Sequence, residues 1–334
     1  MQRPSADTSS NTSSNTSSTA DSSDTATAGT LLTCYLCDQA ADFLRALRTT
    51  PEGGEEAALD LRRPARRISA ALHTFRPFLD AAWADRLRTE LAWLSGTLAR
   101  EHAYTARLAR LLEALGRLSD TKAEPALSSI GAARAGALLE RQLTLARTRA
   151  HSAALQALGS SRFHAVADSV ALLASEVPLD PSAHADADAV DGLPSAVESS
   201  AHRLTEAVAV LPLGRASLPY NAEGLSDAQD APWHTVRLLL RLNRYAHEVL
   251  YADLDAEGRP GLDPRVFGAG QALDRHRAAS EAASAAASAA RTPRIAPATA
   301  YALGVLHADQ RHEVEAARYA FQQVWQQRAA VTAP

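Results

Sequence analysis

One stretch of the sequence carries regularly spaced cationic side chains, from Trp233 to Glu248 (WHTVRLLLRLNRYAHE). Apolar residues recur there at three- and four-residue steps, which predicts a helix. At about 100° of rotation per residue, four cationic side chains fall within an arc of about 80° on one side: His234, Arg237, Arg241 and Arg244. Such a line suits the binding of an anion, because each guanidinium offers a fork of donors that matches phosphate oxygens.

An earlier stretch repeats this pattern. Residues Leu59 to Leu79 (LDLRRPARRISAALHTFRPFL) superpose on the first stretch with a constant offset of 175 positions. Arg62 then matches Arg237, and Arg66 matches Arg241, while the opposite faces are largely apolar. Two arginine-lined helices at equivalent places indicate an internal duplication. The candidate anion-binding residues are therefore Arg62, Arg66, Arg67, His234, Arg237, Arg241 and Arg244.

The same arginines have a simpler explanation as members of ion pairs within a helical bundle. Glu248 lies four residues after Arg244, the spacing of an ordinary helical salt bridge, and Asp60 flanks Arg62. A charge run is also typical of a solvated helix face. Both explanations stay open at this point. Anion binding requires the two arginine faces to share one groove, whereas the ion-pair explanation places each arginine beside an acid.

Composition limits the class of protein. The chain has 334 residues, of which 46% are hydrophobic and 22% are charged, with a net charge of -4. This is enough apolar material for a core, and enough length for two small domains or one large helical one. A general nucleic-acid binder would normally be basic overall, so an anion site here must be local. Lys122 is the only lysine, so nearly every cation is an arginine.

The spacing of the cysteines and histidines does not indicate a metal site or a redox site. Cys34 and Cys37 form a lone C-Y-L-C without a second pair, which does not make a zinc site. His307 and His312 lie five residues apart and so on different helix faces, unlike metalloprotease ligands. We expect no metal and no cofactor. The N-terminus lacks the apolar core of a signal peptide, and no apolar run approaches membrane-spanning length, so the cytoplasm is expected.

Periodicity predicts an all-α fold after a disordered N-terminal tail. Residues 1–29 are Ser, Thr, Asn, Asp and Ala in near-repeats with almost nothing to bury. Helical periods follow without any stretch of period two, so no strands are expected. The expected helices are approximately 30–47, 59–79, 83–98, 108–118, 130–158, 163–175, 196–210, 233–248, 267–290 and 298–328. A Pro- and Asp-rich connector at 178–194 divides a first half, about 30–177, from a second half, about 195–330.

Beyond these patterns, the chain resembles the CHAD family, the conserved-histidine alpha-helical domain, from about Leu31 to Arg328. The stretches LDLRRPARRISAALHTFRP and WHTVRLLLRLNRYAHE are similar to family patterns close to V-H-D-x-R-V-x-x-R-R-L-R and H-x-x-R-x-x-x-K-R-x-R-Y. AAWADRLRTELAWLSGTL and AYALGVLHADQRHEVEAARYAFQQVW also fit. The resemblance implies two helical-bundle halves related by a pseudo-twofold axis, with a basic groove between them that binds inorganic polyphosphate.

The sequence departs from the family patterns at several positions. Leu59 stands where the first family histidine belongs, Ser69 replaces an arginine, and Leu242 replaces a basic residue. Ala103 and Ala272 fall where the family has acids. CHAD domains are often fused to a CYTH-type triphosphatase, but the E-x-E-x-K element of that domain is absent here. The resemblance therefore predicts polyphosphate binding that is weaker than in a domain with intact motifs.

Binding is predicted rather than turnover. Polyphosphate carries about one negative charge per phosphate and needs a line of cations, each charge-assisted hydrogen bond contributing about 1.5–3 kcal/mol. No activated nucleophile, metal cluster or glycine-rich phosphate loop is evident, so no enzymatic activity is expected. The alternative function is a structural adaptor, a degenerate CHAD domain that binds a protein partner and has lost polyphosphate. We expect polyphosphate as the partner, no membrane and no specific nucleic acid, and a cytoplasmic location at polyphosphate granules.

Overall fold

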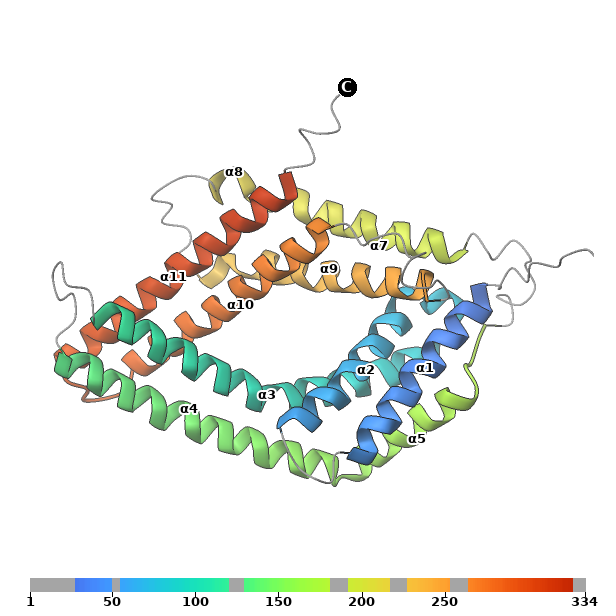
Figure 1. Ribbon diagram of the computed structural model, residues 1–334, viewed down its shortest axis with the longest axis horizontal. Coiled ribbons are helices and arrows are strands. Elements are labelled where there is room, and N and C mark those ends of the chain that lie inside the picture. Colours follow the sequence, from blue (N-terminus) through green and yellow to red (C-terminus); the bar gives the residue numbers. More distant parts are fainter. Residues whose placement is uncertain are drawn as a thin grey trace, which may run out of the picture.

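The computed structural model describes residues 28–49, 55–119, 129–180, 192–216, 227–252 and 264–326. Within these ranges the chain forms helices and no strand, which confirms the all-α prediction (Figure 1). One isolated antiparallel bridge joins Leu79 to Leu179. Residues 1–27 of the predicted disordered tail and residues 181–191 of the predicted connector lie outside the described residues.

Long helices make up most of the described residues. In chain order they are α1 (Ala28–Thr49), α2 (Glu55–Thr74), α3 (Ala81–Ser119), α4 (Ser129–Leu158), α5 (Ser161–Ser175), α7 (Gly192–Ala209), α9 (Ala231–Leu250), α10 (Pro264–Ala290) and α11 (Pro297–Gln326). Short helical turns also occur at η2 (Arg76–Phe78), α8 (Leu213–Ala216) and η5 (Asp227–Gln229). None of the described helices is long and apolar enough to cross a lipid bilayer.

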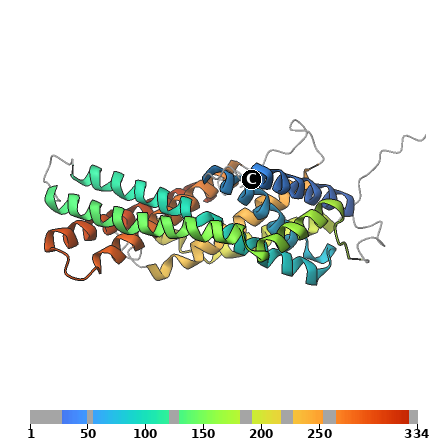
Figure 2. The ribbon, with the colours of Figure 1, turned by 90° about the horizontal axis from the view of Figure 1, so that it is seen from below.

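The order of helix packing occurs twice along the chain. In the first series α1 packs on α2, α2 on α3, and α3 on α4. In the second, α7 packs on α9, α9 on α10, and α10 on α11. The arginine helices predicted from the sequence, α2 and α9, hold the same place in both series, as an internal duplication requires. Seen edge-on, the two series together form a flat, elongated body (Figure 2).

Apolar side chains of the described residues form three separate cores. The first joins α1, α2 and α5 to the adjoining ends of α3, α7 and α9, around Phe43 and Phe75. The second joins the far ends of α3 and α10 to α4 and α11, around Leu111 and Leu303. The third lies between α7, α9, α10 and α11, around Trp233. The helices α3, α9 and α10 each run from one core to another, so the space between the cores is bordered by the middles of these helices (Figure 1).

The helix α3 differs from the sequence prediction. The apolar periods at 83–98 and 108–118 predicted two helices, but Ala81–Ser119 is one continuous helix. Leu98 belongs to the first core and Leu111 to the second. Between them the helix crosses the space that separates the cores, so apolar side chains are not required there. The apolar periodicity of the sequence therefore stops where α3 leaves a core, although the helix itself continues.

A buried ion cluster fixes the start of α9. The carboxylate of Asp230, just before that helix, accepts hydrogen bonds from Arg311 at 2.7 and 3.0 Å and from Arg318 at 2.6 Å. Ser280 of α10 donates a further hydrogen bond to the same carboxylate. All three charged side chains are at least 95% buried. Because such charges are stable only when paired, the cluster holds α9 against α10 and α11.

Candidate functional site

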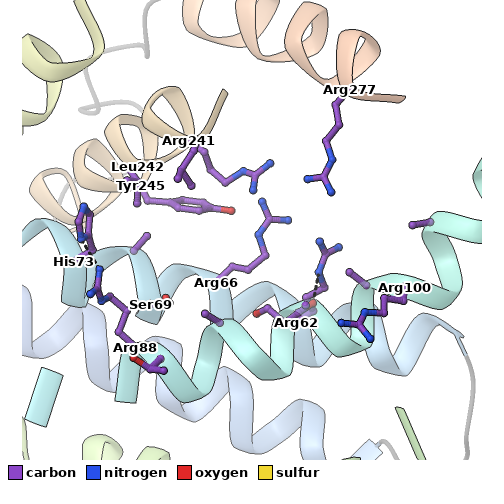
Figure 3. Close-up of a pocket in the computed structure, with 18 of the residues that line it drawn as sticks. Arg62, Arg66, Ser69, His73, Arg88, Arg100, Arg241, Leu242, Tyr245 and Arg277 are labelled. Atoms are coloured by element: carbon purple, nitrogen blue, oxygen red, sulfur yellow. Dashed lines mark hydrogen bonds between the residues drawn. The ribbon is translucent and has the colours of Figure 1, made fainter. Parts of the chain in front are cut away.

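A cavity of about 820 Å³ lies between α2, α3, α9 and α10, in the space left by the three cores (Figure 3). Its described lining contains seven arginines and a single carboxylate, that of Glu281. The arginines come from all four helices: Arg62 and Arg66 of α2, Arg88, Arg100 and Arg107 of α3, Arg241 of α9 and Arg277 of α10. The cavity is therefore strongly basic, although the chain as a whole has a net charge of -4.

Burial on the opposite helix faces turns the arginines of α2 and α9 into the cavity. On α2 the cavity side chains follow three- and four-residue steps: Arg62, Arg66, Ser69 and His73. Leu61 and Ile68 of the same helix are fully buried in the first core and fix its rotation. On α9, the burial of Val236 and Asn243 leaves Arg241 on the cavity side.

The helix α3 provides the empty volume. Small side chains line the cavity along one face of this helix: Ala92, Ser95, Gly96, Ala99 and Ala103. A Cβ atom added at Gly96 would meet no other atom within 4 Å, so the space beside it is open. Arg88 and Arg107 bracket this stretch, and their separation along α3 is about 28 Å at roughly 1.5 Å per residue.

Arg62, Arg66 and Arg241 form the central arginine group of the cavity, and their guanidinium groups extend into it (Figure 3). None of the three has a described carboxylate within ion-pair distance, and Arg62 Nε donates instead to the Ser95 carbonyl at 3.2 Å. Burial, and next the charge of Arg66, lower the pKa of Arg62 to about 10 and that of Arg241 to about 9. The positive charges therefore oppose one another, and an anion placed among them would relieve that repulsion.

Glu281 binds two other arginines of the lining. Its Oε2 accepts a hydrogen bond from Arg107 Nη2 at 2.5 Å, and its Oε1 accepts one from Arg277 Nε at 2.7 Å. Burial alone would raise the pKa of Glu281, but the hydrogen bonds and charges of Arg277 and Arg107 lower it. Arg88 is also engaged, because its Nη1 lies 2.9 Å from His73 Nδ1. Arg88, Arg107 and Arg277 therefore already donate hydrogen bonds within the protein before any ligand binds.

Two residues predicted from the sequence, Arg67 and Arg244, lie outside the cavity lining. Both contact Glu248: Arg67 Nε donates to its Oε2 at 2.9 Å, and Arg244 Nε lies 3.7 Å from its Oε1. The Arg67 pair also joins α2 to α9. For these two arginines the geometry matches the ion-pair explanation that the sequence left open.

Arg237 and His234 do not belong to the lining of the main cavity, although the charge of Arg237 acts on Arg62 and Arg241. Arg237 Nε donates to Asp274 Oδ1 at 2.5 Å, and the Arg237 side chain is 17% exposed. His234 lines a second cavity of about 490 Å³, together with three serines of α10: Ser280, Ser284 and Ser288. Its Nδ1 is buried without a described hydrogen-bond partner, and burial lowers the pKa of His234 although Asp230 raises it.

The sequence prediction missed the cavity residues of α3 and α10. Arg88, Arg100 and Arg107 lie on one face of α3, and Arg277 on α10 completes the set. A signal was available for α3, because the small residues between its arginines also follow helical spacing and mark a face that no core covers. The Arg277 position had no comparable signal.

The arrangement is suited to a multiply charged oxyanion. Guanidinium groups from four helices approach one open volume, and each offers paired donors to oxygens. The described residues contain no group of three or more His, Cys, Asp or Glu that would hold a metal ion. Cys37 Sγ instead donates to the Leu173 carbonyl at 3.5 Å, within the bundle.

Comparison with known families gives this geometry a context. The sequence profile of the CHAD domain matches residues 38–264, which is more than half of the chain. The chain belongs to the CHAD domain family. The matched region includes α2, α3 and α9, the three helices that carry most of the cavity arginines.

Two solved structures are similar over most of the chain. PptA from Streptomyces chartreusis shares 59% sequence identity with a TM-score of 0.76, over 90% of this chain and 100% of that one. The CHAD domain from the plant Ricinus communis shares 20% identity with a TM-score of 0.51, over 88% of this chain and 92% of that one, which shows a common fold. A comparison with curated proteins found no match.

Three of the five departures from the family patterns lie in the cavity. Ser69, Leu242 and Ala103 belong to its lining, whereas Leu59 and Ala272 do not. Two expected cations and one expected acid are thus missing from the wall. The arginines of α3 and α10 lie in the same wall and keep it basic.

Proposed function

We propose that this CHAD protein binds inorganic polyphosphate, or a closely related polyanion, in the cavity between α2, α3, α9 and α10. The observation that carries the proposal is the central arginine group of Arg62, Arg66 and Arg241, which no described carboxylate neutralises. Polyphosphate is the ligand associated with the CHAD fold, and the family match covers two of the helices that supply this group.

The shape of the cavity favours a chain of phosphates over a single one. Its arginines are distributed along the wall and come from four helices, so one phosphate cannot contact all of them. A flexible chain with about one negative charge per phosphate can meet them in succession, with charge-assisted hydrogen bonds of about 1.5–3 kcal/mol each. Arg62, Arg66 and Arg241 would hold its middle, and Arg88 and Arg100 would hold the part that runs along α3.

We propose binding without turnover. The lining has five hydroxyl groups without an evident activating base, those of Ser69, Thr89, Ser95, Tyr104 and Tyr245. The imidazole of His73 is engaged, because a guanidinium only donates and His73 Nδ1 must therefore accept from Arg88. Release of phosphate from polyphosphate by the purified protein, above a buffer control, would contradict this part of the proposal.

Calorimetric titration with polyphosphate of defined lengths tests the proposal. The wild type should bind, and the double variant Arg66→Gln/Arg241→Gln should bind at least about a hundredfold more weakly, as expected for two lost charged hydrogen bonds. Arg86→Gln is a matched control, because Arg86 is exposed on α3 outside the cavity lining. Equal affinities for the double variant and the control would place the binding elsewhere.

A second candidate function is the structural adaptor. It is favoured by the ion pairs of Arg67, Arg237 and Arg244, which are three of the seven arginine and histidine residues predicted to bind the anion. On this hypothesis the arginines stabilise the bundle and a helical face binds a protein. Failure of the wild type to bind polyphosphate even at low salt would favour the adaptor.

We also propose a cytoplasmic location at polyphosphate granules. This follows from the proposed ligand, because a protein that binds long polyanions concentrates where they accumulate. A fluorescent fusion of the wild type should mark granules, and the Arg66→Gln/Arg241→Gln variant should be dispersed. Dispersed fluorescence for the wild type would contradict this part.

A further inference from the structure

We propose that Glu281 is a built-in competitor for the anion, an internal carboxylate that limits how tightly the cavity binds polyphosphate. This role of Glu281 rests on the proposed function, because it concerns the affinity of the same cavity for polyphosphate. Glu281 is the one carboxylate among the described residues that line the main cavity. It lies in α10 and contacts arginines of α10 and α3.

Both carboxylate oxygens of Glu281 are used. Oε2 accepts from Arg107 of α3 at 2.5 Å, and Oε1 accepts from Arg277 one helical turn earlier at 2.7 Å. The side chains of Arg107 and Glu281 are 17% and 33% exposed. These are the contacts that two phosphate oxygens would make with the same guanidinium groups. Glu281 therefore occupies a place that the ligand could take.

The other acids that pair with nearby arginines lie outside the cavity lining. Glu248 and Asp274 pair with Arg67 and Arg237, which do not line the cavity either. Asp85 lies 3.4 Å from Arg88 of the lining, but this pair is partly exposed. Arg277 lines the cavity and faces the central arginine group, and its charge contributes to the lowered pKa of Arg62 (Figure 3). A ligand seated on the central arginine group therefore lies beside Arg277 and beside the carboxylate that neutralises it.

Glu281 also stands at the boundary between the two cavities. Arg107 and Glu281 line both of them, and no other residue is common to the two linings. Beyond this pair lies His234, whose buried Nδ1 has no described hydrogen-bond partner. Displacement of the carboxylate would let a long anion extend past Arg107 toward His234, while a short anion would stay on the central arginine group. Removal of the carboxylate should therefore increase the affinity for long polyphosphate chains more than the affinity for short ones.

The test compares Glu281→Gln with Glu90→Gln. Glutamine keeps the size of the side chain and an acceptor oxygen but removes the negative charge. Glu90 pairs with Arg162 at 2.6 Å outside the cavity, so Glu90→Gln changes the net charge of the protein equally and leaves the cavity unchanged. Affinities for inorganic phosphate, tripolyphosphate and long polyphosphate are measured across a salt series, and folding is checked by thermal unfolding.

We expect Glu281→Gln to bind long polyphosphate about tenfold tighter than the wild type, roughly the effect of one charged hydrogen bond. The slope of log affinity against log salt should steepen by about 0.7–0.9, since one more cation becomes available to the ligand. The gain should be smaller for tripolyphosphate and smallest for inorganic phosphate. Glu90→Gln should resemble the wild type. Glu281→Ala is the second variant if glutamine prevents folding, with the same expected direction.

The outcomes separate the two proposals. If the wild type binds and Glu281→Gln binds no tighter than Glu90→Gln, the competitor role is wrong and the proposed function stands. If the wild type does not bind but Glu281→Gln does, the competitor role is supported in its strongest form. If neither binds at low salt, the proposed function fails and this inference fails with it.

Discussion

Arg66 of α2 and Arg241 of α9 extend into the same cavity from two helices that hold equivalent places in the two series of packed helices (Figure 3). After burial, the charge of Arg66 is the main cause that lowers the pKa of Arg241 to about 9. Folded proteins usually pair their buried charges, so two guanidinium groups held together without a described acid work against folding. Such an arrangement is typical of a site where binding is maintained at the expense of stability.

Neutralising Arg241 should therefore stabilise the protein in the absence of ligand. Its pKa is lower in the folded chain than in the unfolded one, so below about pH 9 its charge destabilises the folded state. We expect Arg241→Gln to raise the melting temperature, by about 2 °C for roughly each 1 kcal/mol of electrostatic destabilisation that it removes. Scanning calorimetry at pH 7 measures this, with Arg86→Gln as an unchanged control. A lower melting temperature for Arg241→Gln would mean that this arginine contributes to folding.

Polyphosphate binding should weaken in alkaline solution. The pKa of Arg241 is about 9 and that of Arg62 about 10 in the free protein, and a bound anion favours the charged forms and raises both values. Binding should therefore take up protons near pH 9, and the affinity should fall as the pH rises through the pKa values of the complex. Titrations in two buffers of different ionisation enthalpy count these protons. The absence of proton uptake, or an equal uptake in Arg241→Gln, would contradict the expectation.

Most of the fold could be predicted from the sequence because its signals are local. Helical periods and the proline- and glycine-rich breaks gave helices close to those observed, and the 175-residue offset related α2 to α9, which hold the same place in the two packing series. The prediction was wrong for α3, because apolar periodicity reports contact with a core and α3 leaves the first core after Leu98 and enters the second near Leu111. Between these two cores α3 borders an open space, so its sequence shows no apolar periodicity there.

The candidate site was predictable only in part. Arg62, Arg66 and Arg241 were predicted and lie in the main cavity, because their spacing sets the helix face on which they lie. The partners of the other arginines were not predictable, since Arg67 and its acid Glu248 are 181 positions apart. Ion pairs between distant helices depend on tertiary packing, which no local spacing reports.

The buried cluster around Asp230 was also absent from the sequence analysis, and it gives a clear stability prediction. Asp230→Asn should destabilise the protein by about 3–5 kcal/mol, because Arg311 and Arg318 would remain buried without their carboxylate. Urea unfolding measures this loss. Asp274→Asn is the comparison: it breaks the pair with Arg237 in which the acid is 62% exposed, and should change stability by less than about 1 kcal/mol.

The same cluster predicts how stability depends on acid. Hydrogen bonds and charges from the cluster outweigh the effect of burial and hold the pKa of Asp230 far below its ordinary value. Its contribution is therefore fully present above the unfolded pKa of 3.8 and is lost as the pH falls below that value. The free energy of unfolding of the wild type should therefore decline as the pH falls below 3.8. Asp230→Asn lacks this carboxylate, so its free energy of unfolding should decline less over the same pH range. Parallel pH profiles for the two proteins would contradict this assignment.

The arginines that share Glu248 should matter for folding rather than for binding. Arg244→Gln removes a half-exposed side chain 3.7 Å from the acid, and we expect less than a twofold change in polyphosphate affinity. Arg67→Gln should also leave binding nearly unchanged but lower the melting temperature, because the Arg67 pair joins α2 to α9. A large loss of affinity in either variant would extend the binding surface beyond the cavity.

Restoring a cation at Leu242 should strengthen binding and weaken the fold. Leu242 lines the cavity at a position where the CHAD pattern has a basic residue. An arginine there would add a charged contact to the ligand and, without ligand, one more positive charge beside Arg241. We therefore expect Leu242→Arg to bind polyphosphate about tenfold tighter, the scale of one charged hydrogen bond, and to melt at a lower temperature. Leu59→Arg is the control, because Leu59 lies outside the lining. If the two variants bind equally well, the gain comes from net charge and the cavity is not the binding site.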